Sequence, residues 1–480
     1  MFGSDEKEYL LNILHSTPRL VENKLIKNNR PLNHRQDYFY LKDAIDIFLN
    51  EDTDNRFFIM PGIRGVGKTT ILYQLFDYLH NQKDIPQTQI LYLDLDRLKD
   101  FGNINLQKYL DIFIRDINER NFLNNNPLFI FVDESQYVNN WALVGKIIFD
   151  ETKNVFLIFT GSDALNLESN NDAARRAIKK QIYPLSFSEY LYLKYDSPIP
   201  KDLEEKFIDM IFTGNISEAR EIEKDLKLNV FMNIKRDIQK EWEDYIQYGG
   251  LPFSFNREDN EIIQLTIDMK NRIIEKDLDL FGSFTSSTRL NAYQLLNIIA
   301  LQKPSEISLN KLANILEISK KTVDNLLSTL EETQIIFHID SYGPIVKRTR
   351  RPAEYYFLST QVKSCIYQSN GQATRNKNEY LGFLVENLVA STLFKVKNKF
   401  RNDFGIFYDP ENEGVDFLIN TLSGDVIPVE VGIGQKNKRQ ISGAIKKYKS
   451  DYGFVISSTK SEITKDGNVI FIPLITFSLL

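Results

Sequence analysis

The sequence contains little cysteine and histidine, and this scarcity excludes two kinds of architecture. Of its 480 residues, one is a cysteine, Cys365, and four are histidines, which lie far apart at His15, His34, His80 and His338. A single cysteine cannot form a disulfide within the chain, and so few scattered residues cannot supply a Cys/His zinc cluster. Such cysteine usage fits a reducing compartment, so we expect a cytoplasmic protein.

Long apolar runs and an excess of positive charge are also missing. The first ten residues, MFGSDEKEYL, are charged and lack the apolar centre of a signal peptide. No apolar run is long enough to cross a membrane, so we expect no membrane association. The formal net charge is −6. A nucleic-acid partner would therefore need a local basic patch, because the chain has no global positive field.

The spacing of apolar residues predicts an α/β multidomain fold. After a helical lead-in over residues 1–50, short apolar runs alternate with amphipathic helices, as in a parallel sheet covered by helices. The helical period dominates from about 190 to 300, and the end of the chain returns to mixed α/β. The expected strands of the first sheet are Phe57–Met60, Ile90–Asp94, Phe129–Asp133 and Val155–Thr160.

A glycine-rich segment after the first expected strand has the form of a phosphate-binding loop. Glycines let such a loop close so that its backbone N–H groups point at phosphates, and the helix that begins at Lys68 adds the positive end of its dipole. We predict that Lys68 contacts the β- and γ-phosphates of ATP and that the Thr69 hydroxyl binds Mg²⁺. A plain glycine turn is the alternative, which the strand before and the helix after disfavour. The predicted nucleotide-binding residues are Gly62, Ile63, Arg64, Gly65, Val66, Gly67, Lys68, Thr69 and Thr70.

Two acids end a later expected strand and complete the predicted site. The segment Leu128–Glu134 reads LFIFVDE, a buried strand that ends in two carboxylates. We predict that Asp133 holds Mg²⁺ and that Glu134 orients and deprotonates the attacking water. Adjacent acids could instead simply begin a turn, but the glycine-rich loop upstream favours the catalytic interpretation.

Three further residues are weaker candidates for the same site. Ser162 follows the strand at 155–160, where a polar side chain can contact the γ-phosphate, although capping the next helix explains it almost as well. Arg175 and Arg176 lie in a basic stretch, Ala173–Lys180, which we expect to be helical. Either could be an arginine finger that stabilises the transferred phosphoryl group, but a solvated basic face is the favoured alternative.

These segments resemble a family of bacterial and archaeal AAA-type (STAND-like) ATPases, which join an ATPase to a winged helix and a restriction-endonuclease-like domain. The resemblance covers roughly residues 20–475 and implies that Glu134 is the catalytic base, but it implies no substrate. The family often carries Gly-Arg where this chain has Ala174-Arg175-Arg176, so the choice of finger stays open. The matching segments are GIRGVGKTT at 62–70, VDESQ at 132–136 followed by Trp141, FTGSDAL at 159–165, YPLSFSEYL at 183–191 and YIQYGGLP at 245–252.

Changes in the sequence pattern near 190, 300 and 375 set the expected division of the chain, and the resemblance supplies the domain types. We expect a helical lead-in at 1–50, a P-loop AAA-like ATPase core at 51–192 and a helical extension at 193–300. A winged helix-turn-helix is expected at 301–375 and a restriction-endonuclease-like α/β domain at 376–480.

The expected winged helix offers basic side chains to a DNA backbone. Ser308 and Ser319 are good N-caps for two short helices, the second of which has the place of a recognition helix. A protein-interaction or spacer role is the open alternative, because contacts to phosphates carry no sequence information. The residues expected to meet DNA are Lys320, Lys321, Lys347, Arg348, Arg350 and Arg351.

The last hundred residues place three acids in the order of a PD-(D/E)XK nuclease core. Glu386 lies on an expected helix, and Asp416 and Glu430 lie on expected strands, as a possible second metal site. In such nucleases a lysine two residues after the last acid activates water. Here that position is Gly432, so we favour a degenerate fold used for binding over an active nuclease.

The sequence therefore predicts a Mg²⁺-dependent ATPase that acts as a nucleotide-driven switch on its flanking domains. The alternatives are an ATP-regulated, metal-dependent nuclease and an ATP-binding scaffold or DNA-binding protein with little turnover. Assembly into an oligomer is compatible with each of these hypotheses.

Overall fold

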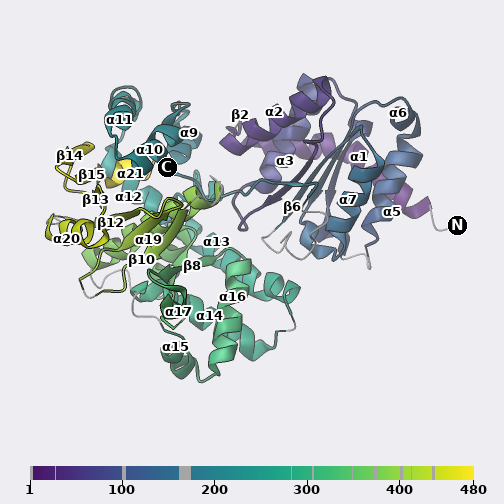
Figure 1. Ribbon diagram of the computed structural model, residues 1–480. Coiled ribbons are helices and arrows are strands. Elements are labelled where there is room, and N and C mark those ends of the chain that lie inside the picture. Colours follow the sequence, from purple (N-terminus) through teal and green to yellow (C-terminus); the bar gives the residue numbers. More distant parts are fainter. Residues whose placement is uncertain are drawn as a thin grey trace. The chain divides into compact units, whose positions relative to one another are not determined.

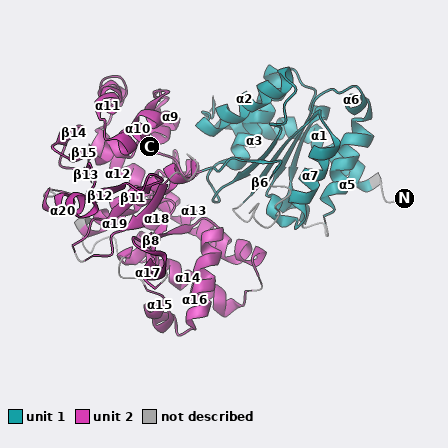
Figure 2. Cartoon of the chain, viewed as in Figure 1, with its two compact units in different colours: residues 1–182 teal, residues 183–480 magenta. Residues whose placement is uncertain are grey.

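In the computed structural model the chain forms two compact units, residues 1–182 and residues 183–480 (Figures 1 and 2). The segments expected at 193–300, 301–375 and 376–480 all fall in the second unit. The finer division into five segments therefore stays a prediction. The structure describes residues 4–27, 29–99, 104–161, 175–282, 284–304, 308–348, 350–371, 377–399, 404–411, 413–434 and 438–480.

Unit 1 is built on a parallel sheet of five strands in the order β4-β5-β6-β3-β7. Its central strands are buried at every residue, because helices lie on both faces (Figure 1). The predicted parallel sheet is confirmed, and the four expected strands match within one residue at each end. The strands are β3 (Phe57–Pro61), β4 (Ile90–Asp94), β5 (Leu128–Asp133), β6 (Val155–Gly161) and β7 (Ile178–Lys179).

Strand β7 corrects one expectation. The stretch Ala173–Lys180 was expected to be helical, but its described part is a turn at 175–176 followed by β7. This strand pairs with β3, where Ile178 lies opposite Phe58. Hydrogen bonds offered by the edge of β3 outweigh the local helical pattern, as tertiary pairing commonly does for short segments.

The helices of unit 1 cover the sheet and include the N-terminal lead-in. Helix α1 packs against α3 and β4, and its Leu10 and Leu14 belong to the same apolar core as the strands. A short hairpin, β1 (Ile26–Lys27) and β2 (Arg30–Pro31), separates α1 from α2. The helices are α1 (Ser4–Leu25), α2 (Gln36–Asn50), α3 (Lys68–Asp77), α4 (Leu95–Leu98), α5 (Leu106–Asp111), α6 (Glu119–Leu123) and α7 (Trp141–Glu151), with π-helical turns η1 (Tyr78–Gln82) and η4 (Ile112–Ile117).

Unit 2 begins with helices, as the sequence predicts. The expected caps are in place: the Ser308 hydroxyl accepts a hydrogen bond from Lys311 N at 3.3 Å, and the Ser319 hydroxyl accepts one from Thr322 N at 3.1 Å. The principal helices are α9 (Phe187–Tyr195), α10 (Leu203–Thr213), α11 (Ser217–Asn229), α12 (Ile238–Tyr248), α13 (Asp259–Arg272), α14 (Ser286–Leu301), α15 (Leu309–Leu316), α16 (Lys320–Glu332), α17 (Ile345–Arg348), α18 (Thr360–Ser369), α19 (Lys377–Lys399), α20 (Lys438–Tyr448) and α21 (Leu474–Phe477).

A mixed sheet of eight strands, in the order β14-β15-β13-β12-β11-β10-β8-β9, carries the rest of unit 2. Alternate residues of its central strands face two apolar clusters, one packed against α19 and one against α20. The hairpin β8–β9 belongs to this sheet, because β8 pairs in parallel with β10. The strands are β8 (Ile336–Ser341), β9 (Glu354–Phe357), β10 (Phe404–Tyr408), β11 (Phe417–Thr421), β12 (Val426–Gly432), β13 (Gly453–Ser457), β14 (Thr464–Asp466) and β15 (Val469–Pro473).

A search of the described helices for a membrane span found none with the necessary length and apolar character.

Candidate functional site

The glycine-rich loop lies between β3 and α3, and its glycines are required by its shape. Gly65 and Gly67 have φ angles of 79° and 104°, in a region of backbone conformation that residues with a Cβ rarely adopt. At Gly62, a Cβ would lie 2.6 Å from the carbonyl oxygen of Ile182. The chain thus folds tightly around this turn, and Gly67 stands immediately before the first residue of α3.

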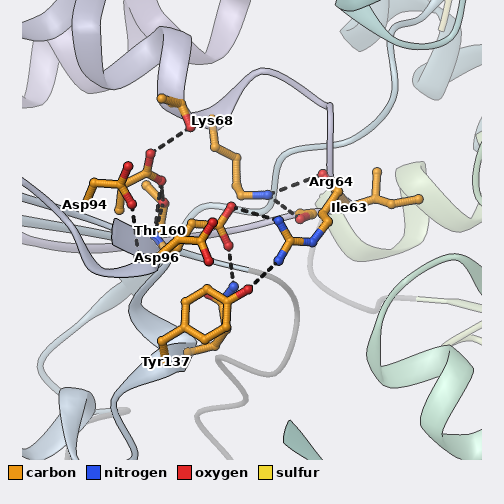
Figure 3. Close-up of polar contacts among 12 residues, drawn as sticks. Ile63, Arg64, Lys68, Asp94, Asp96, Tyr137 and Thr160 are labelled. Atoms are coloured by element: carbon orange, nitrogen blue, oxygen red, sulfur yellow. Dashed lines mark hydrogen bonds and ion pairs between the residues drawn. The ribbon is translucent and has the colours of Figure 1, made fainter. Parts of the chain in front are cut away.

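Lys68 lies along the inside of this loop. Its side chain is buried, and its Nζ donates hydrogen bonds to the carbonyl oxygens of Gly62 at 2.5 Å and Ile63 at 3.3 Å (Figure 3). The ammonium group is therefore held where the loop curves, beside the start of α3. A helix N-terminus and a lysine side chain together suit this site to an anion.

Thr69 and Asp133 join the loop to the end of β5. The Thr69 hydroxyl donates to Asp133 Oδ2 at 2.7 Å, and Tyr92 OH donates to the same oxygen at 3.0 Å. Asp133 Oδ1 accepts a hydrogen bond from the Thr160 hydroxyl at the end of β6. Asp133 is only 2% exposed. Burial raises the pKa of Asp133 and the charge of Glu134 raises it further, against the lowering effect of the two threonine hydroxyls and Lys68.

Glu134 lies next to Asp133 in an uncommon backbone conformation. Its φ and ψ angles are 55° and 45°, the left-handed region. Its Oε1 accepts a hydrogen bond from Arg64 Nη1 at 3.4 Å, and its Oε2 accepts one from Gln136 Nε2. The structure thus brings Lys68, Thr69, Asp133 and Glu134 together at the carboxyl ends of β3 and β5.

Sequence reasoning missed three polar residues at the same edge of the sheet: Tyr92, Asp94 and Thr160. Asp94 ends β4 opposite Asp133 in the strand register. Burial raises the pKa of Asp94, and Asp133 raises it further. Asp94 and Thr160 are the last residues of expected strands, whereas Tyr92 lies in the middle of one. Since parallel strands end at one edge, the position of Asp94 and Thr160 was the signal that could have identified them.

The remaining candidates of unit 1 do not join this cluster in the described chain. Ser162 lies outside the described residues. Arg175 is exposed in the turn before β7. Arg176 forms an ion pair with Asp150 of α7, with 2.8 Å between Nε and Oδ1. The structure therefore gives neither arginine a contact that distinguishes it as a finger.

In unit 2, the three expected acids fall in the predicted order of elements. Glu386 lies on α19, Asp416 immediately precedes β11, and Glu430 is buried in β12. Asp416 Oδ2 accepts a hydrogen bond from Val431 N at 2.6 Å. Among the described residues, no group of three or more His, Cys, Asp or Glu side chains is arranged to hold a metal ion.

Sequence reasoning also missed partners of Glu386 that come from other elements. Tyr356 OH on β9 lies 2.8 Å from Glu354 Oε2 and 3.1 Å from Glu386 Oε1. The Tyr356 hydroxyl has one proton and can donate it to only one of the two carboxyls. The other contact is a hydrogen bond only if that carboxyl is protonated and donates to the Tyr356 oxygen. Burial raises the pKa of both glutamates to about 7, and the next cause is the charge of Glu386 for Glu354 and the charge of Asp416 for Glu386. Burial lowers the pKa of Lys363 on α18 to about 8, against the opposing effect of Glu386.

Five of the six basic residues expected to meet DNA are exposed: Lys320, Lys321, Lys347, Arg350 and Arg351. Arg348 is half-buried instead. It lies over the ring of Phe407 at 5.2 Å, and its Nε is 3.9 Å from Asp340 Oδ2.

Comparisons with known proteins agree with the architecture of unit 1. Residues 54–191 match the model of an AAA domain, which supports an ATP-binding ATPase. Residues 239–360 and 381–477 match two domains of unknown function (DUF8612 and DUF4143). Among solved structures, the Aeropyrum pernix ORC1 protein in complex with DNA is 10% identical and covers 73% of this chain and 96% of that chain, with a TM-score of 0.31. That score is too low to carry an argument.

Two archaeal relatives extend over most of the chain. The "Uncharacterized protein MJ1544" of Methanocaldococcus jannaschii is 26% identical over 420 residues, 83% of this chain and 80% of that protein. The "Uncharacterized protein MJ1637" of the same organism is 32% identical over 475 residues, 98% of this chain and 94% of that protein. The chain is therefore an AAA-domain protein that belongs to the same family as MJ1637.

Proposed function

We propose that this protein binds ATP together with Mg²⁺ and hydrolyses it. The observation that carries this proposal is the 2.7 Å hydrogen bond between the Thr69 hydroxyl and Asp133 Oδ2. It brings together the two residue types that share the nucleotide's metal ion in P-loop enzymes, from two segments 64 residues apart. The AAA match over residues 54–191 supports the same function.

The residues present fit the cation and the phosphates. Mg²⁺ prefers oxygen ligands and is held by one or two protein groups plus substrate phosphates, so a single hydroxyl and a single carboxylate suffice. When bound, Mg²⁺ would neutralise charge on the phosphates. Lys68 and the backbone N–H groups of residues 62–69 would hold the phosphates in place. Glu134 would take a proton from the attacking water and orient it.

Two substitutions separate binding from turnover. We expect Lys68→Ala to abolish ATP binding and Glu134→Gln to keep binding while turnover stops, because only the second removes the proton acceptor. Fluorescent-nucleotide titration and phosphate release measure the two steps. Arg115→Ala is a matched control, because Arg115 is a partly exposed cation that pairs with Glu151 at the end of α7. Wild-type turnover in Glu134→Gln would refute the base assignment, and a lack of affinity for Mg·ATP would refute the function.

A role as a nucleotide-driven switch that engages DNA is a second proposal. Helices α14, α15 and α16 followed by the hairpin β8–β9 have the order of elements of a winged helix. The observation that favours DNA is the exposure of five of the six predicted basic residues on α16 and beside α17. Contacts of this kind bind the phosphate backbone without reading sequence.

The nuclease alternative has less support. The lysine of such sites is replaced by Gly432, and the described acids do not form a group able to hold a metal ion. A scaffold that binds ATP with little turnover is the other alternative, and steady phosphate release by the wild-type protein would exclude it.

A further inference from the structure

The side chain of Arg64 has a position that the phosphate-binding role of its loop does not explain. Arg64 lies between Gly62 and Gly65, yet its guanidinium points across to the end of β5 (Figure 3). Nη1 donates to Glu134 Oε1 at 3.4 Å, and Nη2 donates to Tyr137 OH at 2.9 Å. Both ends of the ion pair are largely buried, with 10% of the Arg64 side chain and 19% of the Glu134 side chain exposed.

Glu134 has a left-handed backbone, which must be held by contacts from its surroundings. A residue with a Cβ in the left-handed region is strained and keeps that conformation only when its surroundings enforce it. Glu134 N donates to Asp133 Oδ1 at 3.1 Å, which fixes the main chain. Its carboxylate is held on one side by Gln136, in the turn that follows, and on the other by Arg64.

We propose that Arg64 is a positioning residue, which fixes the Glu134 carboxylate relative to the loop that surrounds the phosphates. The planar guanidinium bonds to Glu134 and to Tyr137 at once, so it links the loop, the carboxylate and the turn η5 (Ser135–Tyr137). Arg64 thereby connects the Glu134 carboxylate directly to the loop that would hold the phosphates. This inference rests on the proposed ATPase function, because it needs Glu134 to act as the base.

The substitutions Arg64→Ala and Arg64→Lys test the inference when kcat and the Kd for ATP are measured separately. Arg64→Ala is expected to lower kcat about 10- to 100-fold, because displacing a catalytic group by about an ångström costs rate of that order. The Kd for ATP should change less than about threefold, since Lys68 and the backbone amides remain. Arg64→Lys should recover part of kcat, because a lysine can bond to Glu134 but cannot span to Tyr137 as well.

A double-mutant cycle with Glu134→Gln decides how Arg64 acts. Because Glu134→Gln is expected to stop steady turnover, the cycle is measured as the slow single-turnover hydrolysis that long incubation detects. If Arg64 acts through Glu134, Arg64→Ala lowers that slow rate no further. A further loss of more than tenfold in that background, or a tenfold loss of ATP affinity in the single variant, would mean that Arg64 acts on the nucleotide directly and would overturn the proposal. Wild-type kcat in Arg64→Ala would also overturn it.

Two controls keep this test independent of folding and of the proposed function. Tyr137→Phe leaves Arg64 in place and removes only its second anchor, so we expect a loss of kcat smaller than that of Arg64→Ala. An unchanged kcat in both Arg64→Ala and Tyr137→Phe would contradict the proposal. Arg115→Ala shows the effect of removing a different arginine of unit 1, one that pairs with Glu151. If the wild-type protein binds ATP but shows no turnover, it is the proposed function that fails.

Discussion

At the scale of single residues, the most unusual chemistry lies away from the nucleotide loop, around Tyr356. Glu354 and Glu386 both contact its hydroxyl, and the pKa of each is raised to about 7. Burial is the first cause in each case, followed for Glu354 by the charge of Glu386 and for Glu386 by that of Asp416. A carboxyl that holds its proton in the folded state makes stability depend on pH.

The pKa of Glu354 leads to a prediction with a definite sign. Its folded value of about 7 exceeds the ordinary value of 4.5, so its stabilising contribution is complete below about pH 4.5 and is lost as pH rises through 7. Glu354→Gln imitates the protonated form. We expect it to match the wild type near pH 4.5 and to be more stable at pH 8, by on the order of 1–3 kcal/mol.

Urea unfolding at the two pH values measures this difference. The chain has two tryptophans, and Trp242 is the one in unit 2, so a Trp141→Phe background reports that unit alone. Glu205→Gln makes the same change at an exposed position of α10 and serves as the control. If Glu354→Gln is equally or less stable than the wild type at pH 8, the raised pKa of Glu354 is wrong.

The nucleotide residues could be predicted because a contiguous motif carries them, whereas their neighbours could not. The loop at 62–70 and the pair Asp133-Glu134 can be recognised from the local spacing of their residues. Thr160 and Tyr92 contact Asp133 from separate strands, and Lys363 approaches Glu386 from another helix. Apart from the strand-end position of Thr160, no sequence pattern marks these contacts, because they depend on which elements become neighbours in the fold.

At the scale of elements, the structure explains two segments that the family resemblance singled out without a role. The segments 183–191 and 245–252 pack against each other. Tyr245 OH donates to Leu185 O at 2.9 Å, and Leu185 N donates to Gly250 O at 2.9 Å. A Cβ at Gly249 would lie 2.7 Å from the ring of Tyr190. These residues therefore join α9 to the end of α12.

Replacing glycine by alanine should have opposite effects on the stability of unit 2 at Gly249 and at Gly443. Gly249→Ala introduces a methyl group that meets the Tyr190 ring, so we expect it to destabilise the protein by about 1–3 kcal/mol. Gly443→Ala, in the middle of α20, meets no atom within 4 Å and should stabilise by about 0.5–1 kcal/mol through helix propensity. Urea unfolding followed by Trp242 fluorescence measures both. Equal effects of the two substitutions would contradict the close packing at Gly249.

Sequence patterns predicted the long buried strands but not the short ones. The four expected strands of unit 1 were found within one residue, since buried parallel strands are continuous apolar runs. The two-residue β7 was missed because its pairing with β3 overrides a local helical pattern. The three-residue β14 was missed because half-exposed edge strands carry no apolar signature.

At the scale of the whole molecule, the open question is whether a nucleic acid influences the nucleotide site. We expect double-stranded DNA to raise ATP turnover if the basic residues of unit 2 contact its backbone, with an effect that weakens as salt rises. Phosphate release with and without single- and double-stranded DNA measures this, and the Lys320→Ala/Lys321→Ala protein should lose the response. A flat response at low salt would favour a protein partner.

The parallel pairing of β8 with β10 has a mechanical consequence. The basic residues Lys347, Arg348, Arg350 and Arg351 lie in the connection between β8 and β9, and these two strands continue the same hydrogen-bonded ladder as β10, β11 and β12. We therefore expect a force on this hairpin to pass through backbone hydrogen bonds toward β12, the strand that holds Glu430.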